Sequence, residues 1–222
     1  MIGIFGNGEI AKVFAHYQTP TFFTVDKEFN TGPLLGLPVV DFDKDKLYPQ
    51  IDENGIILNT VSPSAALFLF PISYTKLNSL RKEKLLQAKE WGLNIGSYID
   101  TTVKRFYNIA VGEGSIVLDG CTINPLVQLG KGVICWSNAH VGHSSILEDF
   151  VWVTTNATIC GQCTIGEQSF IGANAVIAPQ VKIGKRNIIA AGAIVTKDTE
   201  DDAVYLEGRN NKIDKKSWEI SL

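Results

Sequence analysis

Residues 151–177 read VWVTTNATICGQCTIGEQSFIGANAVI, and an aliphatic residue returns at every sixth position of this stretch. The same period extends over residues 111–195, with Cys replacing the aliphatic residue once. A second series, mostly of small residues, lies two positions before each of these. Residues two apart on a strand face the same way, so both series point inward and the residue between them points outward. This period fits neither an α-helix nor simple strand alternation, and it predicts a parallel β-helix.

Three such hexads make one triangular coil, so the stretch supplies about five coils. Glycine follows the aliphatic position at several corners, among them Gly142 and Gly166, and we expect its conformational freedom to permit the turn there. Of the 4 cysteines, Cys121, Cys135 and Cys163 fall on inward positions. Cysteine serves there as a small apolar filler, so we expect neither a disulfide nor a metal site.

The first 60 residues predict a small, Rossmann-like α/β unit. Residues 2–5 and 22–25 are short apolar strands, and residues 38–40 and 55–58 supply a third and a fourth at most. A dehydrogenase would need more strand–helix repeats than these, which argues against hydride transfer.

The turn after the first strand reads Gly6-Asn7-Gly8-Glu9-Ile10-Ala11, which matches G-x-G-x-x-A and leads into a helix. Such a turn lets backbone N–H groups approach a phosphate closely. Asp26, at the end of the second strand, can accept a hydrogen bond from a ribose or a base. The turn therefore predicts a nucleotide-like ligand.

Residues 76–91 carry a helical pattern that ends at Gly92. We therefore expect two domains, a small α/β domain over residues 1–92 and a β-helix domain over residues 93–222. The tail after the last hexad mixes charged residues with Trp218 and other apolar residues, and we expect it to cap the open end of the β-helix core.

Composition excludes several classes of partner. The net charge of -3 and the pI near 5.6 argue against nucleic acid. The apolar run at residues 65–72 is too short to span a bilayer and contains Pro71, and no basic segment precedes the first strand. The sequence predicts a cytoplasmic protein that binds neither nucleic acid nor membrane.

The Gly6-Asn7-Gly8-Glu9-Ile10-Ala11-Lys12-Val13 start, the hexad array and the segment Val141-Gly142-His143 together resemble the NeuD/PglD-like sugar acyltransferases. The resemblance covers nearly the whole chain and implies a left-handed β-helix. It implies transfer of an acetyl group from acetyl-CoA to the amino group of a nucleotide-linked amino-deoxy sugar, for surface glycan biosynthesis, with O-acetylation of a sugar as the near variant. It also implies a homotrimer with the cofactor between neighbouring helices.

The resemblance assigns residues to three roles. The general base is His143, one of 3 histidines in the chain, with His140 beside it. The residues near the nucleotide-linked sugar are Gly8, Glu9, Ile10, Asp26 and Lys27. The residues near acetyl-CoA are Trp152, Gly161, Ala173 and Ala191. No metal is implied.

Two positions depart from the family. Ser144 stands where an acidic residue commonly follows the base, so either His140 or a carboxylate such as Glu148 or Asp149 orients the ring, or the base is weaker. Trp152 stands where the resemblance places a histidine that contacts acetyl-CoA; an indole can pack against the cofactor but only donates a hydrogen bond.

A catalytically silent trimeric scaffold remains the alternative to an enzyme. The two histidines on an outward face of the β-helix favour the enzyme. The position of Trp136 and Trp152 on the wall predicts an apolar outer surface, which a trimer would bury.

Overall fold

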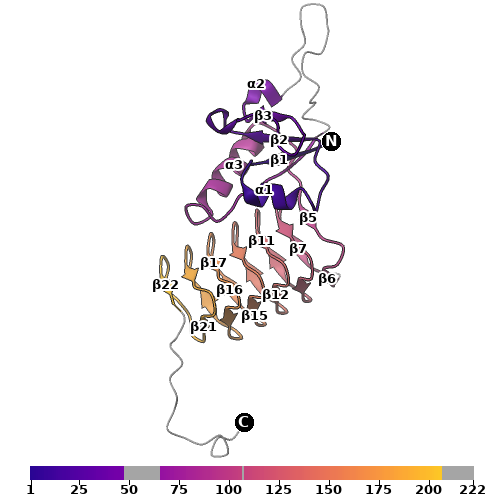
Figure 1. Cartoon of the computed structure of the whole chain (residues 1–222). Coiled ribbons are helices and arrows are strands. Elements are labelled where there is room, and N and C mark those ends of the chain that lie inside the picture. Colours follow the sequence, from indigo (N-terminus) through magenta and orange to yellow (C-terminus); the bar gives the residue numbers. More distant parts are fainter. Residues whose placement is uncertain (48–65, 107, 207–222) are drawn as a thin grey trace, which may run out of the picture.

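The computed structural model describes residues 1–47, 66–106 and 108–206. A small α/β unit at the start of the chain, here called the N-terminal unit, lies against one side of a long β-helix (Figure 1). Among the described residues, no helix is both long and apolar enough to cross a membrane.

A parallel sheet forms the centre of the N-terminal unit, with strand order β3-β2-β1-β4. Its strands are β1 (Ile2–Phe5), β2 (Phe22–Val25), β3 (Val39–Asp41) and β4 (Leu67–Leu69). The first two strands match the prediction, β3 begins one residue later than predicted, and the strand expected at 55–58 lies outside the described residues. The structure instead places the fourth strand within the apolar run at 65–72, which is typical of a parallel strand buried on both faces.

The helices of the N-terminal unit are α1 (Glu9–Phe14), the 3-10 helix η1 (Lys27–Phe29), α2 (Lys44–Leu47) and α3 (Ser79–Glu90). Phe14 of α1 shares a buried cluster with Ile4 on one face of the sheet. Leu85 of α3 shares another with Phe5 on the opposite face. The two helices therefore sandwich the sheet, and α3 confirms the helix predicted near residues 76–91.

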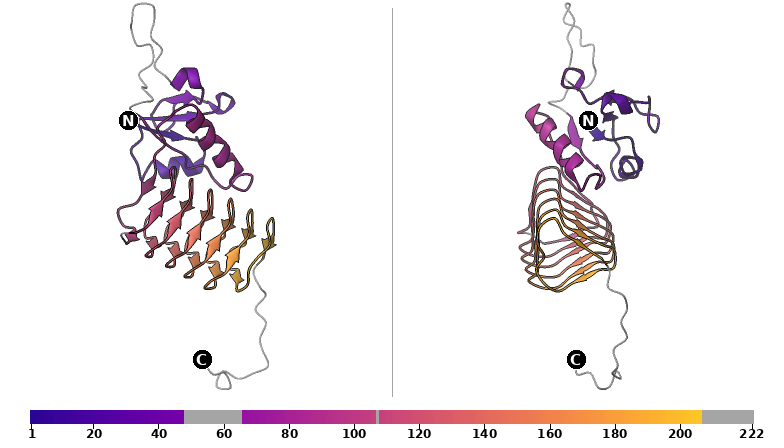
Figure 2. Two further views of the ribbon diagram at one scale, coloured as in Figure 1. Left: turned by 180° about the vertical axis from the view of Figure 1, so that it is seen from behind. Right: turned by 90° about the vertical axis from the view of Figure 1, so that its left-hand side faces the viewer.

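The β-helix has three parallel sheets that form the faces of a triangular prism (Figure 2, right). The seven-stranded face contains β5 (Tyr98–Ile99), β8 (Ile116–Val117), β11 (Ile134–Cys135), β14 (Trp152–Val153), β17 (Phe170–Ile171), β20 (Ile188–Ile189) and β22 (Val204–Tyr205). The six-stranded face contains β6 (Lys104–Arg105), β9 (Thr122–Ile123), β12 (His140–Val141), β15 (Thr158–Ile159), β18 (Val176–Ile177) and β21 (Ile194–Val195). The five-stranded face contains β7 (Ala110–Val111), β10 (Gln128–Leu129), β13 (Ile146–Leu147), β16 (Thr164–Ile165) and β19 (Lys182–Ile183).

The interior of the prism confirms the hexad prediction. Both inward series form one continuous buried cluster, which includes Val141, Ile159 and Ile177 of the aliphatic series and Ala139 and Ala157 of the small series. The structure therefore has the predicted class, an α/β unit followed by a parallel β-helix of about five coils.

The corners correct one expectation. The residue with a positive φ lies three positions after the aliphatic residue, as at Ser144 (φ 58°) and Asn156 (φ 57°). Glycine directly after the aliphatic residue serves close packing between coils instead. A Cβ added at Gly142 would lie 2.5 Å from the carbonyl carbon of Cys160 in the next coil. The corner glycines are thus required because the backbones approach each other closely.

The N-terminal unit covers the seven-stranded face across its width, except at the last strands, where Ile188 and Val204 are exposed. Ile116 and Ile134 point outward from that face into the cluster that also contains Phe14. At one edge, the Tyr17 hydroxyl donates a 2.7 Å hydrogen bond to Asp119. At the other edge, the Arg81 side chain of α3 donates hydrogen bonds to the carbonyl oxygens of Gly132 and Phe150, where the chain enters the seven-stranded face.

The chain after Val195 extends the prism. Strand β22 pairs in parallel with β20, so residues 204–205 add one more strand to the seven-stranded face. The remainder of the predicted cap, including Trp218, lies outside the described residues.

Candidate functional site

The two predicted catalytic histidines lie on one coil of the β-helix. His140 is the outward residue of β12 on the six-stranded face and is half-buried, with Nε2 3.3 Å from the side-chain nitrogen of Asn124. His143 follows the strand at the corner between the six- and five-stranded faces and is exposed. Its carbonyl oxygen accepts a 2.8 Å hydrogen bond from the Gln162 backbone, which fixes the corner against the next coil.

The imidazole of His143 lies over Gly161 of that next coil. A Cβ built on Gly161 would come within 2.6 Å of His143 Nε2. Gly161 has no positive φ, so the absence of a side chain matters here for space and not for backbone conformation. The predicted base and one predicted acetyl-CoA residue are therefore neighbours.

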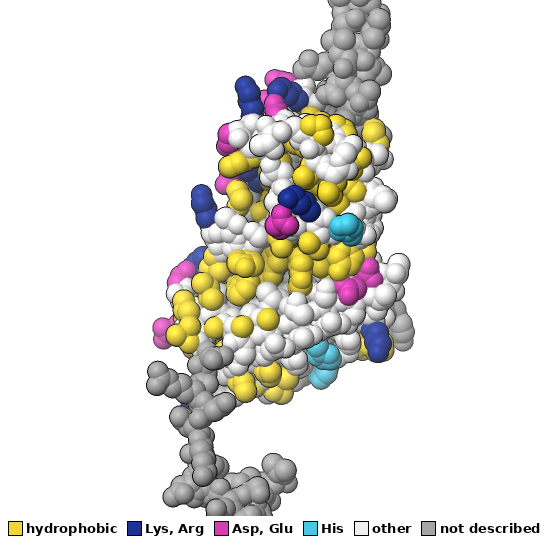
Figure 3. Space-filling view, in the orientation of Figure 1, with side chains coloured by type: hydrophobic (Ala, Val, Ile, Leu, Met, Phe, Trp, Pro, Cys, Tyr) yellow, Lys and Arg dark blue, Asp and Glu magenta, His cyan; other side chains and the backbone are white. Residues whose placement is uncertain are grey.

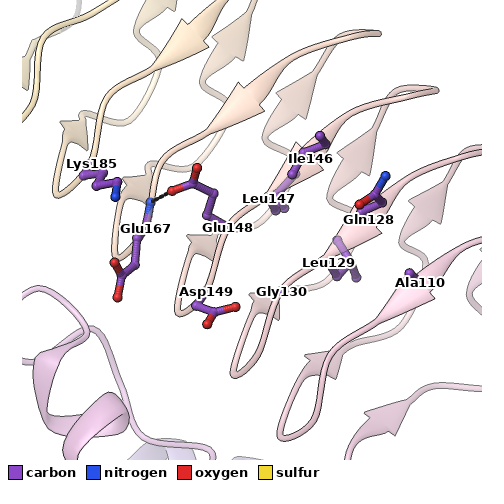
Figure 4. Close-up of a pocket in the computed structure, with 10 residues that line it drawn as sticks. All are labelled: Ala110, Gln128, Leu129, Gly130, Ile146, Leu147, Glu148, Asp149, Glu167 and Lys185. Atoms are coloured by element: carbon purple, nitrogen blue, oxygen red, sulfur yellow. Dashed lines mark hydrogen bonds between the residues drawn. The ribbon is translucent and has the colours of Figure 1, made fainter.

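The residues proposed to orient His143 in place of an acidic neighbour lie elsewhere. Glu148 accepts a 3.0 Å hydrogen bond from the Glu167 backbone (Figure 4). Asp149 accepts a 2.8 Å bond from the Lys131 backbone. Both occupy the corner between the five- and seven-stranded faces. They line a groove of about 510 Å³ that extends over the five-stranded face, where Ala110, Gln128 and Ile146 also line it.

In the described part of the chain, the His140 ring contacts the Asn124 side chain and makes no hydrogen bond to His143, so it does not orient that ring either. Within the described residues, the hydrogen-bond neighbour of the His143 ring is the Ser144 hydroxyl, 3.5 Å from Nδ1. This contact is at the limit of hydrogen bonding. Sequence reasoning missed Asn124. Equivalent residues of adjacent coils stand 18 apart, so Asn124 holds in the preceding coil the position that Gly142 holds beside His143, and this spacing could have indicated it.

The predicted nucleotide-binding residues surround a cavity of about 320 Å³ in the N-terminal unit. Gly8, Glu9, Ile10 and Asp26 line it, together with Phe29 and residues 71–73. Lys27 is exposed on η1, the 3-10 helix that also contains Phe29, but it is not among the residues that line the cavity. The turn and the acidic residue singled out from the sequence are thus brought together in one cavity.

Asp26 has a partner that the sequence did not indicate. Lys84 of α3, only 7% exposed, places its ammonium group 2.6 Å from Asp26 Oδ1. The sequence pattern shows Lys84 only as an inward helical position. The pair joins the cavity to α3. Removal of Lys84 would leave the Asp26 carboxylate without this ion-pair partner, whereas removal of Asp26 would leave Lys84 with Glu83, whose carboxylate lies 3.7 Å away.

The histidine corner and the cavity face opposite directions. The N-terminal unit covers the seven-stranded face, whereas His143 stands at the corner where the other two faces meet. In a triangular prism that corner is opposite the covered face. Figure 3 shows a histidine patch on the lower edge of the β-helix, away from the N-terminal unit. One chain therefore does not bring the cavity and His143 together.

Trp152 corrects the expectation of an outward apolar wall. Its side chain is only 2% exposed, because the N-terminal unit covers it. Arg81 lies 5.2 Å from its ring centroid, Tyr74 meets it edge to face at 5.6 Å, and the half-buried Trp136 stacks on it at 5.6 Å. A bound cofactor has no free surface of this ring to contact in the described structure.

The other two residues predicted near acetyl-CoA lie on a different corner from Gly161. Ala173 and Ala191 occupy equivalent positions in successive coils, where the chain leaves the seven-stranded face. The Gly192 backbone donates a 2.8 Å hydrogen bond to the Ala173 carbonyl, and Ala191 is exposed. Among the described residues, no group of three or more His, Cys, Asp or Glu side chains could hold a metal ion.

Polar contacts fix the N-terminal unit on the β-helix. Arg81 is fully buried, and burial lowers its pKa to about 9, which leaves it protonated at neutral pH. At the opposite edge, hydrogen bonds from Ser137 and Tyr17 hold the pKa of the Asp119 carboxyl below its ordinary value of 3.8. These contacts keep the cavity in a fixed orientation relative to the coils.

The fold and the repeat define a hexapeptide-repeat β-helix protein with an N-terminal α/β unit. Residues 162–197 match the family model described as bacterial transferase hexapeptide (six repeats). No curated protein matches the sequence.

Solved structures show the same two-part fold. The acetyltransferase domain of PglB from Neisseria gonorrhoeae FA1090 is 23% identical, with a TM-score of 0.78 over 92% of this chain and 95% of that one, and it has also been solved with acetyl coenzyme A. PerB from Caulobacter crescentus, solved with CoA and GDP-perosamine, is 23% identical (TM-score 0.77, 92% and 93% covered). WeeI from Acinetobacter baumannii AYE is 22% identical (TM-score 0.69, 92% and 95% covered). The chain therefore has the fold of the hexapeptide-repeat acetyltransferases, as the resemblance predicted.

Proposed function

We propose that the protein is an acetyl-CoA-dependent N-acetyltransferase that acts on the amino group of a nucleotide-linked amino-deoxy sugar. The observation that carries the proposal is the exposed His143 imidazole lying over the bare backbone of Gly161, in a chain whose N-terminal unit holds a separate cavity around a Gly-rich turn. Structures of the same fold that contain CoA and GDP-perosamine support this acceptor class.

In the proposed reaction, the sugar amine attacks the thioester carbonyl of acetyl-CoA. His143 accepts the proton that the nitrogen loses as the new C–N bond forms. The thioester C–S bond then breaks, and the departing CoA sulfur takes up a proton. A sugar hydroxyl could be acetylated by the same steps, which makes O-acetylation the near variant.

The proposed surface for acetyl-CoA comprises Gly161, Ala173 and Ala191. Their small side chains leave backbone groups accessible to an extended ligand. Gly161 fits this role best, because its missing Cβ leaves space that the His143 ring uses. Trp152 is omitted because its ring is buried.

We further propose that the working site forms between copies of the chain in a homotrimer. His143 stands opposite the face that carries the cavity, so a sugar bound in one chain needs the histidine of a neighbouring copy.

The first test is release of CoA thiol from acetyl-CoA with a panel of nucleotide-linked 3-amino and 4-amino sugars. Thiol release that depends on one of these sugars supports the proposal. The Ser144 hydroxyl, 3.5 Å from His143 Nδ1, is a weak hydrogen-bond partner for this ring. This weak contact is the observation that favours the scaffold alternative. Absence of release with every sugar and with hydroxyl acceptors would support the scaffold.

A second test addresses the shared site. His143→Ala removes the base, and Gly8→Phe fills the cavity; a Cβ at Gly8 meets nothing within 4 Å, and its φ of -76° suits any residue. Each variant alone should be inactive. Co-expression should restore part of the activity, because mixed trimers contain sites with an intact cavity and an intact histidine. Mixed oligomers that stay inactive would show that each site uses one chain.

A further inference from the structure

An exposed aromatic side chain forms part of the wall of the cavity in the N-terminal unit. Phe29, the last residue of η1, lines the cavity and is 57% exposed. The other phenylalanines of the N-terminal unit, such as Phe5 and Phe22, are buried in its core. Phe29 therefore presents its ring to the cavity and not to the protein interior.

Hydrogen bonds hold the backbone of Phe29 in place, while its ring is exposed. Its N–H donates a 2.9 Å hydrogen bond to the Asp26 carbonyl. Its own carbonyl accepts a 2.7 Å bond from the side-chain amide of Asn7, within the Gly-rich turn. This hydrogen bond gives a reason for the asparagine in the Gly-rich turn, since it ties the backbone of Phe29 to the turn, and both line the cavity.

A fixed acceptor accompanies the ring. Lys84 Nζ lies 2.6 Å from Asp26 Oδ1, while among the described residues Asp26 Oδ2 accepts no hydrogen bond. The hydroxyls of Ser73 and Thr75, 2.6 Å apart, stand on another wall of the same cavity. A flat apolar surface beside a carboxylate and hydroxyl groups suits a planar heterocycle with N–H groups at its edge.

We propose that Phe29 is the platform on which the nucleobase of the substrate stacks, and that it gives the cavity its preference for a nucleotide over a bare phosphate or sugar phosphate. This inference rests on the proposed function, because it assumes that the cavity holds the nucleotide end of the acceptor. Phe29 acts as a positioning residue, which places the sugar without touching the reacting atoms.

The test is isothermal titration of the full chain with UDP, GDP, CDP and dTDP, and with ribose 5-phosphate and inorganic pyrophosphate as probes without a base. Phe29→Leu should weaken the tightest nucleoside diphosphate by about 5- to 150-fold, the range expected for one base stacked on an aromatic ring. Phe29→Trp should keep wild-type affinity to within about threefold, because an indole still stacks. Neither change should alter binding of the probes without a base.

Phe106→Leu is the matched control, because Phe106 is 48% exposed on the β-helix, outside the cavity. Unchanged affinity of Phe29→Leu for the nucleoside diphosphates would overturn the inference. In a further titration with CoA, a loss of affinity confined to CoA would also overturn it, since the ring would then stack the adenine of the donor. Nucleotide binding that depends on Phe29 without any acetyl transfer would support the inference and contradict the proposed function.

Discussion

Replacement of Arg81 by Met should separate the N-terminal unit from the β-helix more than any surface change on α3. The guanidinium is fully buried and donates four hydrogen bonds. Its acceptors are the carbonyl oxygens of Gly132 (2.9 Å), Phe150 (2.9 Å) and Ile72 (3.1 Å), and the side-chain oxygen of Asn78 (3.0 Å). Two of these acceptors belong to the β-helix and two to the N-terminal unit, so one side chain joins both.

The magnitude follows from two opposing terms. Methionine fills similar volume but leaves four buried acceptors without a donor, at about 1–3 kcal/mol each. Removal of a buried charge returns several kcal/mol of desolvation energy. We therefore expect a net loss of about 3–5 kcal/mol in the free energy of unfolding, because the cost of four unsatisfied acceptors exceeds the desolvation energy that is recovered. Lys82→Met, on the same helix, removes a contact whose side chains are 35% and 27% exposed, and should cost under about 1 kcal/mol.

Urea unfolding followed by tryptophan fluorescence and by circular dichroism measures this loss. Trp152 reports on the interface directly, because the Arg81 guanidinium lies 5.2 Å from its ring. The fluorescence transition of Arg81→Met should move to lower urea and precede the loss of β-helix signal. Equal urea midpoints for Arg81→Met and Lys82→Met would refute the reasoning, since the guanidinium would then gain no more from its bonds than it loses by burial.

The remaining predictions concern the site and the pH response. His143→Ala should lower kcat by about 10²–10⁴ in steady-state assays without changing the urea midpoint, and an unchanged kcat would place the base elsewhere. Gly161→Ala places a Cβ 2.6 Å from His143 Nε2 and should lower kcat by up to about 10²-fold at nearly wild-type stability. Gly142→Ala places a Cβ 2.5 Å from the backbone of the next coil and should instead lower the free energy of unfolding in urea by about 1–3 kcal/mol. The lowered pKa of Asp119 contributes stability above its unfolded pKa near 3.8, and this stability is lost as the pH falls through the lower folded pKa. Asp119→Asn should therefore flatten the fall of the urea midpoint as the pH is lowered below about 5.

The β-helix could be predicted from the sequence because each inward position is repeated at a fixed spacing. The interior of a coil accepts only apolar or small residues, so the constraint appears directly in the order of residues, from Val111 to Val195. Short apolar runs placed β1 and β2, and a helical pattern of residues placed α3. Asp26 and the Gly-rich turn could be assigned to one cavity because the carboxyl ends of neighbouring parallel strands meet at one edge of a sheet.

Other features required the tertiary structure. The buried strand β4 reads as an apolar run of no particular period, and Trp152 reads as an outward residue until a second unit covers it. The partnership of Lys84 with Asp26 joins residues 58 apart, for which local pattern carries no signal.

The sequence by itself determined that this protein is a hexapeptide-repeat β-helix with a Gly-rich turn at its start and His143 on an outward corner. Only the tertiary structure decided which face of the prism the N-terminal unit covers. Period and pattern fix which residues point inward, but they leave the three outer faces equivalent. The choice among those faces depends on contacts between distant segments, such as Arg81 with Phe150, and it places the cavity opposite His143.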